Sequence, residues 1–313
     1  MQLLYALAEL RTPFLDAVLG ALTNCGGELV FMAAAIIVFW CVSKSCGYYM
    51  LTVGFVGTIV NQFLKLVFRI PRPWVKDPDF QIVESARAEA TGYSFPSGHT
   101  QNVFASFGCL GRWTKRAWLR VVCALLIVVT AFSRMYLGVH TPLDVGVSFG
   151  IGLVLVFALY PLFRDIDSHP KRLYLLFGAM AVLGAAYLLF AELWPFPADV
   201  DAANLASGRK NAYTLLGAVL GMTFAYWLDR RYVHFDVRAV WWAQVLKAVL
   251  GLAITIGLRA ALKAPLLALC GGHNVANLIR YALMVIFAAG IWPMTFGWFG
   301  RLGRKKPASG ASD

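Results

Sequence analysis

The segment SRMYLGVHTPLD (residues 133–144) joins two apolar runs: it includes the end of 117–138 and the beginning of 143–163. A transmembrane helix needs about 20 mainly apolar residues, and each of these runs is long enough. Seven further runs have the same character, although 28–43 and 99–112 are short and need tilting or flanking residues to cross a bilayer. The sequence therefore predicts an all-α, polytopic transmembrane helical bundle with spans at 28–43, 47–68, 99–112, 117–138, 143–163, 172–193, 211–229, 239–261 and 275–299.

The composition supports a membrane protein. Of the 313 residues, 59% are hydrophobic and 14% charged, and the mean hydropathy is +0.66. Soluble domains carry about 45–50% apolar and about 25% charged residues. This balance excludes an ordinary soluble enzyme, a disordered chain and a nucleic-acid-binding module. The six cysteines are scattered without a CxxC pair, which argues against a disulfide framework or a zinc site.

The basic residues predict how the chain is oriented. Residues 3–23 mix apolar side chains with three charges and predict an amphipathic helix on the membrane surface, with a tenth span as the alternative. Nine spans place the two ends of the chain on opposite sides. The C-terminal side carries 15 of the 28 basic residues, so the positive-inside rule makes it cytoplasmic. Residues 301–313 are basic, then small and polar, and predict a disordered cytoplasmic tail.

Three polar clusters interrupt the apolar pattern, at 65–73, 94–99 and 133–144. Counting spans places all three on the side opposite the basic loops, where four consecutive helix ends can form one pocket. The clusters supply three cations, Lys65, Arg72 and Arg134. Cations and the N–H groups of a helix N-terminus converge where a phosphate binds. Ser97 and Gly98 would supply a hydroxyl and a close backbone approach at such a helix start.

The two histidines of these clusters predict a reaction. Asp144 lies four residues after His140 and can hold one ring nitrogen, so that the other acts as a nucleophile. His99 is then the general acid for the leaving oxygen. Each residue also has a structural explanation: Lys65 can reach the headgroups, and Thr141 with Asp144 fits a helix capping box. The structural explanation must place all of them on one face by chance.

The same residues resemble the type 2 phosphatidic acid phosphatase (PAP2) superfamily of integral membrane lipid phosphatases. The family pattern K-x6-R-P, P-S-G-H and S-R-x5-H-x3-D is matched in full, from Lys65 to Asp144. The resemblance covers a six-span core, residues 1–193. No family motif is recognised in the extra transmembrane region 194–300, so oligomerisation, lipid entry and a separate role all stay open for it.

The resemblance implies a role for each matching residue. His140 would form a phosphohistidine, His99 would protonate the leaving group, and Asp144 would orient His140. The phosphoryl group would be bound by Lys65, Arg72, Ser97, Gly98 and Arg134. No metal and no other cofactor is implied.

The expected reaction is hydrolysis of a lipid phosphate at the extracytoplasmic face, in a bacterial plasma membrane. Polyprenyl (undecaprenyl) diphosphate is the first candidate substrate. Phosphatidic acid, phosphatidylglycerol phosphate and a sphingoid phosphate are alternatives. A lipid phosphotransferase, in which an alcohol replaces water, and a lipid transporter or flippase remain as other classes. The expected partners are the phosphorylated lipid and membrane lipids, with no nucleic acid.

Overall fold

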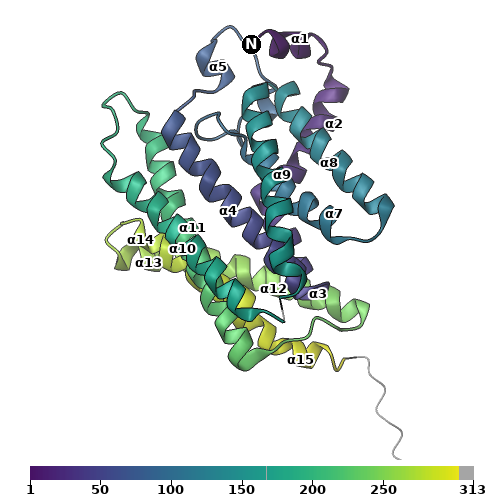
Figure 1. Ribbon diagram of the computed structural model, residues 1–313. Helices are drawn as coiled ribbons and strands as arrows, with labels where there is room; N and C mark the ends of the chain where they lie inside the picture. Colours follow the sequence, from purple (N-terminus) through teal and green to yellow (C-terminus); the bar gives the residue numbers. More distant parts are fainter. Residues whose placement is uncertain (167, 303–313) are drawn as a thin grey trace, which may run out of the picture.

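A computed structural model describes residues 1–166 and 168–302, so most of the expected tail, 303–313, lies outside the described residues (Figure 1). Within the described ranges every regular element is helical and no β-strand occurs. The predicted all-α membrane bundle is therefore confirmed.

All nine expected spans fall on helical segments. The helices of the predicted core are α3 (Glu28–Cys41), α4 (Lys44–Phe68), α6 (Gly98–Val103) with η3 (Phe104–Gly108) and α7 (Cys109–Trp113), α8 (Ala117–Tyr136), α9 (Pro142–Arg164) and α10 (Pro170–Leu193). The C-terminal region contributes α11 (Ala202–Leu228), η4 (Asp229–Val233), α12 (Trp241–Ala261), α13 (Lys263–Leu269), α14 (Val275–Ile286), η5 (Phe287–Ile291), η6 (Trp292–Thr295) and α15 (Phe296–Phe299). Short helices α5 (Pro73–Lys76) and η2 (Glu84–Ala86) lie in the long loop after α4.

Six of the described helical segments are long and apolar enough to cross a membrane: those containing α4, α8, α9, α10, α12 and α14. A seventh arises if α2 (Pro13–Thr23) and α3, which are bent by 50° at a short break, count as one span. The helix α11 and the interrupted segment α6–η3–α7 are outside this set. The protein is a multi-pass membrane protein, and the count of nine spans stays a prediction.

The expected amphipathic segment 3–23 consists of two helices, α1 (Gln2–Glu9) and α2. The break between them follows from Pro13, which disfavours a helical conformation in the preceding residue. Thr12 accordingly adopts an extended conformation, and its side chain accepts a hydrogen bond from the Leu15 amide at 3.3 Å.

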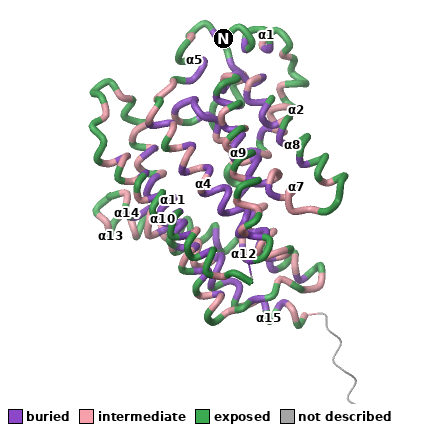
Figure 2. The backbone as a smooth tube through the Cα atoms, viewed as in Figure 1, coloured by how far each residue is buried: buried purple, intermediate pink, exposed green. Residues whose placement is uncertain are grey.

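The helix α4 forms the centre of the bundle, and the C-terminal region packs beside it (Figures 1 and 2). Over half of the membrane window of α4 is buried, compared with 17% for the window containing α12. The Trp40 indole of α3 donates to the Ala288 carbonyl at 2.8 Å, and Lys44 forms an ion pair with Asp229 at 2.8 Å. The predicted core and the C-terminal region are thus joined by a buried hydrogen bond and a partly buried ion pair.

Two glycines allow α11 to lie directly against α14. A Cβ atom at Gly217 would lie 2.2 Å from the Leu278 carbonyl oxygen, and one at Gly221 would lie 2.6 Å from that of Ala282. Small residues four positions apart permit this close approach of two helix backbones.

We expect Gly217→Ala to destabilise the protein by roughly 1–3 kcal/mol, because the added methyl group meets backbone that cannot turn aside. The control is Gly178→Ala on α10, where a Cβ atom has open space around it. Thermal unfolding of the two detergent-purified variants, followed by the loss of monodisperse protein on gel filtration, measures the difference. Equal melting temperatures would contradict the tight α11–α14 contact.

Candidate active site

The structure brings the three polar clusters together at the ends of four helical segments. Lys65 lies in the last turn of α4, Arg134 lies in the last turn of α8, and His99 lies in the first turn of α6. His140 and Asp144 lie where α9 begins. Lys65, Arg72, Ser97, Arg134, His140 and Asp144 are all buried. Charged side chains are rarely buried without partners, so this cluster has the character of a binding site.

A tight turn positions His140. The Arg134 carbonyl accepts hydrogen bonds from the amides of Val139 and His140 at 3.1 and 3.2 Å. Gly138 closes the turn with a φ of +80°, a conformation that glycine adopts without strain. The spacing between Arg134 and His140 therefore reflects a folded loop that turns the imidazole back toward the arginine cluster.

Arg72 contacts the imidazole directly and defines its tautomer. Its Nη1 lies 3.0 Å from His140 Nε2, and the same nitrogen donates to the Val139 carbonyl at 2.9 Å. Arginine only donates hydrogen bonds, so Nε2 must be the acceptor and carries a lone pair. Backbone carbonyls of Gly92 and Thr91 hold the rest of the guanidinium at 3.0 and 2.7 Å.

The surroundings of His140 favour its neutral form. Burial and the positive charges of Arg72, Arg134 and Lys65 hold the pKa of His140 well below its ordinary value. The ring proton of neutral His140 is then on Nδ1, and the Nε2 lone pair points to Arg72.

Asp144 caps α9 and also faces His140. Its Oδ2 accepts hydrogen bonds from the Thr141 amide at 2.7 Å and from the Ser94 hydroxyl at 2.6 Å. The same oxygen lies 3.6 Å from His140 Nδ1. Asp144 Oδ1 and His140 Nδ1 are buried and have no hydrogen-bond partner among the described residues. The capping and orienting explanations of Asp144 are therefore compatible, since one carboxylate caps α9 and lies beside Nδ1, at a distance just beyond a hydrogen bond.

The other predicted residues differ in their access to the cavity. Lys65, Arg72, Gly98, His99 and His140 line a cavity of about 580 Å³. A Cβ atom at Gly98 would meet no atom within 4 Å, in keeping with its place on the cavity wall. Lys65 Nζ donates to the Tyr93 carbonyl.

Ser97 and Arg134 are buried beside this cavity and are not among its lining residues. The Ser97 amide donates to the Asp144 carbonyl at 3.1 Å, and its hydroxyl accepts from Thr100 Oγ1 at 3.0 Å, so Ser97 ties the first turn of α6 to α9. Arg134 Nη1 donates to Thr23 Oγ1 at 2.9 Å, whereas Nε and Nη2 have no partner among the described residues. Arg134 therefore keeps two nitrogens that can bind an anion.

Three residues of the site carried no predicted role. Ser94 binds Asp144, Thr23 binds Arg134, and Glu89 Oε2 lies 2.9 Å from His99 Nε2. Burial and the positive charges of Arg134, Arg72 and Lys65 lower the pKa of His99. The Glu89 carboxylate opposes this shift, and so would a bound phosphoryl anion, and both would favour the protonated imidazole that a general acid requires. Ser94 stands inside a recognised polar cluster, but Thr23 and Glu89 come from segments whose sequence shows no sign of the contact.

Comparisons with known proteins identify the family of the chain. The family described as "PAP2 superfamily" matches residues 44–167, and "PAP2 superfamily phosphatase, transmembrane extension" matches residues 213–305. The chain belongs to the PAP2 superfamily. The second match also gives a family assignment to most of the C-terminal region, where no motif was recognised from the sequence.

The relatives are named for different lipid phosphates. Undecaprenyl-diphosphatase BcrC of Bacillus subtilis is 33% identical over 39% of this chain and 61% of its own length. Phosphatidylglycerophosphatase B of the same organism is 25% identical over 52% of the chain and 80% of its own length. A probable sphingosine-1-phosphate phosphatase of Dictyostelium discoideum is 27% identical over 71% of the chain and 56% of its own length. No solved structure matches this chain.

We expect Ser94→Ala to lower kcat for phosphate release by about 10- to 100-fold. A hydrogen bond to a charged group contributes about 1.5–3 kcal/mol, and its loss leaves Asp144 less firmly oriented toward His140. The measurement is steady-state phosphate release by the purified variant.

The matched control is Ser148→Ala, on α9 one turn after Asp144. Ser148 is buried like Ser94, but its hydroxyl has no partner among the described residues. Its kcat should stay within about twofold of wild type, since no bond is lost. Equal kcat values for the two variants would remove Ser94 from the site.

Proposed function

We propose that this protein is a membrane lipid phosphatase that transfers a phosphoryl group from a lipid to His140 and then to water. The observation that carries the proposal is the 3.0 Å contact between His140 Nε2 and the guanidinium of Arg72, at the wall of a cavity that Lys65 and His99 also line. A phosphoryl group that enters the cavity would attract Arg72 and Lys65 to its oxygens, and Arg72 would exchange its hydrogen bond to Nε2 for one to the phosphate, so that Nε2 faces phosphorus.

The reaction has two steps. His140 Nε2 forms a bond to phosphorus while the bond from phosphorus to the leaving oxygen breaks, and protonated His99 gives its proton to that oxygen. Asp144 stabilises the positive charge that develops on the His140 ring. In the second step a water oxygen attacks phosphorus, His99 takes its proton, the N–P bond breaks and inorganic phosphate leaves. Binding and charge stabilisation by Lys65, Arg72, Gly98 and Arg134, with Ser97 beside them, supply most of the catalysis. No step requires a metal, and hydrolysis should therefore continue in the presence of a chelator.

The position of the site suits a lipid substrate. The distribution of basic loops predicts that the helix ends that form it face the extracytoplasmic side, where a lipid would keep its chains in the bilayer while its phosphate enters the cavity. The bacterial plasma membrane is the proposed location. Polyprenyl diphosphate is the first substrate to test, in line with the name of the BcrC relative. The names of the other two relatives support phosphatidylglycerol phosphate and a sphingoid phosphate as alternatives.

The test is phosphate release by purified His140→Asn against a panel of polyprenyl diphosphate, phosphatidic acid, phosphatidylglycerol phosphate and sphingosine phosphate, with and without chelator. We expect the variant to lose at least about 1,000-fold in kcat on every substrate that the wild type hydrolyses, because no nucleophile remains.

His234→Asn is the matched control. His234 is exposed and has a φ of +46°, a conformation that asparagine tolerates well. Wild-type rates are expected for this variant. Undiminished phosphate release by His140→Asn would refute the proposed nucleophile, and lipid movement between leaflets without phosphate release by the wild type would favour a transporter.

A further inference from the structure

The cavity extends well beyond the residues that would hold a phosphoryl group. Along α4 it is lined by Lys65, Gln62, Asn61, Thr58 and Phe55, which at 1.5 Å per residue covers about 15 Å toward the middle of the helix. Its other walls come from the first turn of α3, from α6 and from α11. The helix α11 belongs to the C-terminal region, so that region forms part of the cavity wall.

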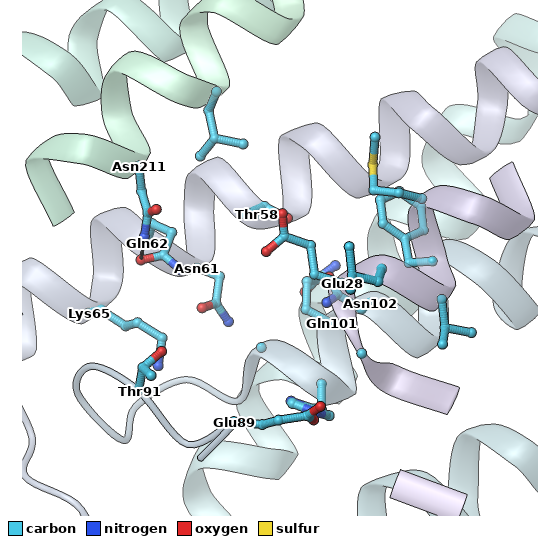
Figure 3. Close-up of a pocket in the computed structure, with 18 of the residues that line it drawn as sticks. Glu28, Thr58, Asn61, Gln62, Lys65, Glu89, Thr91, Gln101, Asn102 and Asn211 are labelled. Atoms are coloured by element: carbon cyan, nitrogen blue, oxygen red, sulfur yellow. Dashed lines mark hydrogen bonds and ion pairs between the residues drawn. The ribbon is translucent and has the colours of Figure 1, made fainter. Parts of the chain in front are cut away.

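Two amide side chains are buried in this wall with unused hydrogen-bonding groups. Asn61 is 2% exposed and Gln101 is 1% exposed. None of their four side-chain nitrogen and oxygen atoms has a hydrogen-bond partner among the described residues. Buried amides are nearly always paired in proteins, and Figure 3 shows the Asn61 amide projecting from α4 into the cavity. These atoms are placed to bind a polar group of a ligand.

The backbone of α4 is shaped to hold Gln101 in this position. A Cβ atom at Gly57 would lie 2.2 Å from Gln101 Nε2. The Gln101 amide therefore occupies space that the side chain of any residue larger than glycine at position 57 would need. Gly57 is one helical turn before Asn61, on the same face of α4. On the other side of Asn61, Gln62 Oε1 accepts a hydrogen bond from Asn211 Nδ2 of α11 at 3.1 Å.

The lysine and arginine side chains lie at one end of the cavity, where Glu89 is also found. Among the described residues that line it, the lysine and arginine side chains are Lys65 and Arg72, both at the end where His140 lies. Beyond them the wall carries neutral amides and the carboxylate of Glu28, followed by apolar side chains such as Phe31 and Phe55. A second phosphate in the amide region would lack a cationic partner and would face Glu28, which is unfavourable.

We propose that Asn61 and Gln101, supported by the Gln62–Asn211 pair, bind a neutral hydroxyl, ester or amide group that lies next to the phosphate ester of the lipid. This inference rests on the proposed function and narrows its substrate to phosphomonoesters with a polar backbone, ahead of a diphosphate on a plain hydrocarbon chain. The adjoining apolar residues then contact the start of the lipid chain, and α11 of the C-terminal region acts in substrate selection.

The experiment compares two lipid monophosphates with the same 18-carbon chain, 1-oleoylglycerol phosphate and oleyl phosphate; oleyl phosphate lacks the ester and the hydroxyl group. Polyprenyl diphosphate is the third substrate. The readout is the ratio of kcat/KM values within one protein preparation, which is insensitive to the fraction of folded enzyme. We expect the wild type to prefer the glycerol lipid over oleyl phosphate by at least about tenfold.

Asn61→Leu, which keeps the size of the side chain and removes its hydrogen bonds, should bring this ratio to within about threefold of one. The contribution of α11 is tested by Thr214→Val, a change at a residue of this helix that lines the cavity. The control is Thr223→Val, the same change on the same helix at a residue that does not line it. The ratio should fall for Thr214→Val and stay at its wild-type value for Thr223→Val.

A wild-type ratio near one, an unchanged ratio in Asn61→Leu, or a preference for polyprenyl diphosphate over the glycerol lipid would overturn the proposed subsite while leaving the phosphatase intact. Failure of the folded wild type to release phosphate from all three lipids would overturn the proposed function and the subsite with it.

Discussion

The contact between the Arg72 guanidinium and His140 Nε2 is the constraint on which the site depends. It places a permanent cation within hydrogen-bond distance of an imidazole that burial and two more cations already keep neutral. Concentrated positive charge inside a membrane protein is unfavourable unless it serves an anion. In the proposed mechanism the cluster would account both for the binding of a phosphoryl group and for the neutral form of His140 that attacks it.

The fold supports this contact from several directions. The turn closed by Gly138 directs His140 back toward Arg72, while Ser97 ties the first turn of α6 to the beginning of α9. Asp144 links the start of α9 to the imidazole of His140. One of its carboxylate oxygens caps α9, accepts a hydrogen bond from Ser94 and faces the ring. The C-terminal region contributes to the cavity as well as to the membrane bundle. Its helix α11 packs against α10 and α14 and also forms a wall of the cavity. The boundary expected at residues 193/194 thus separates two parts of the chain that share one binding cavity.

Much of this could be predicted from the sequence, for physical reasons. Long apolar runs identify membrane helices because the bilayer requires a fixed apolar length, and the polar clusters 65–73, 94–99 and 133–144 stand out against that background. Contacts made by ordinary residues could not be predicted. Nothing in the local pattern around Thr23, Glu89 or Asn61 shows that these side chains reach the site, since their positions depend on how distant helices pack. The helix break within segment 3–23 can be predicted from Pro13, because a proline disfavours a helical conformation in the residue before it. The bend between α2 and α3 depends on tertiary packing and has no such local signal.

The most direct test of the central claim is to look for the covalent intermediate. Wild-type protein is mixed with lipid carrying a labelled terminal phosphate and quenched within milliseconds under alkaline denaturing conditions, where phosphohistidine survives, and the site of labelling is located by mass spectrometry of peptides. The account predicts phosphate on His140, and none in His140→Asn. Label on another residue, or rapid turnover of substrate with no labelled protein at any time point, would contradict it.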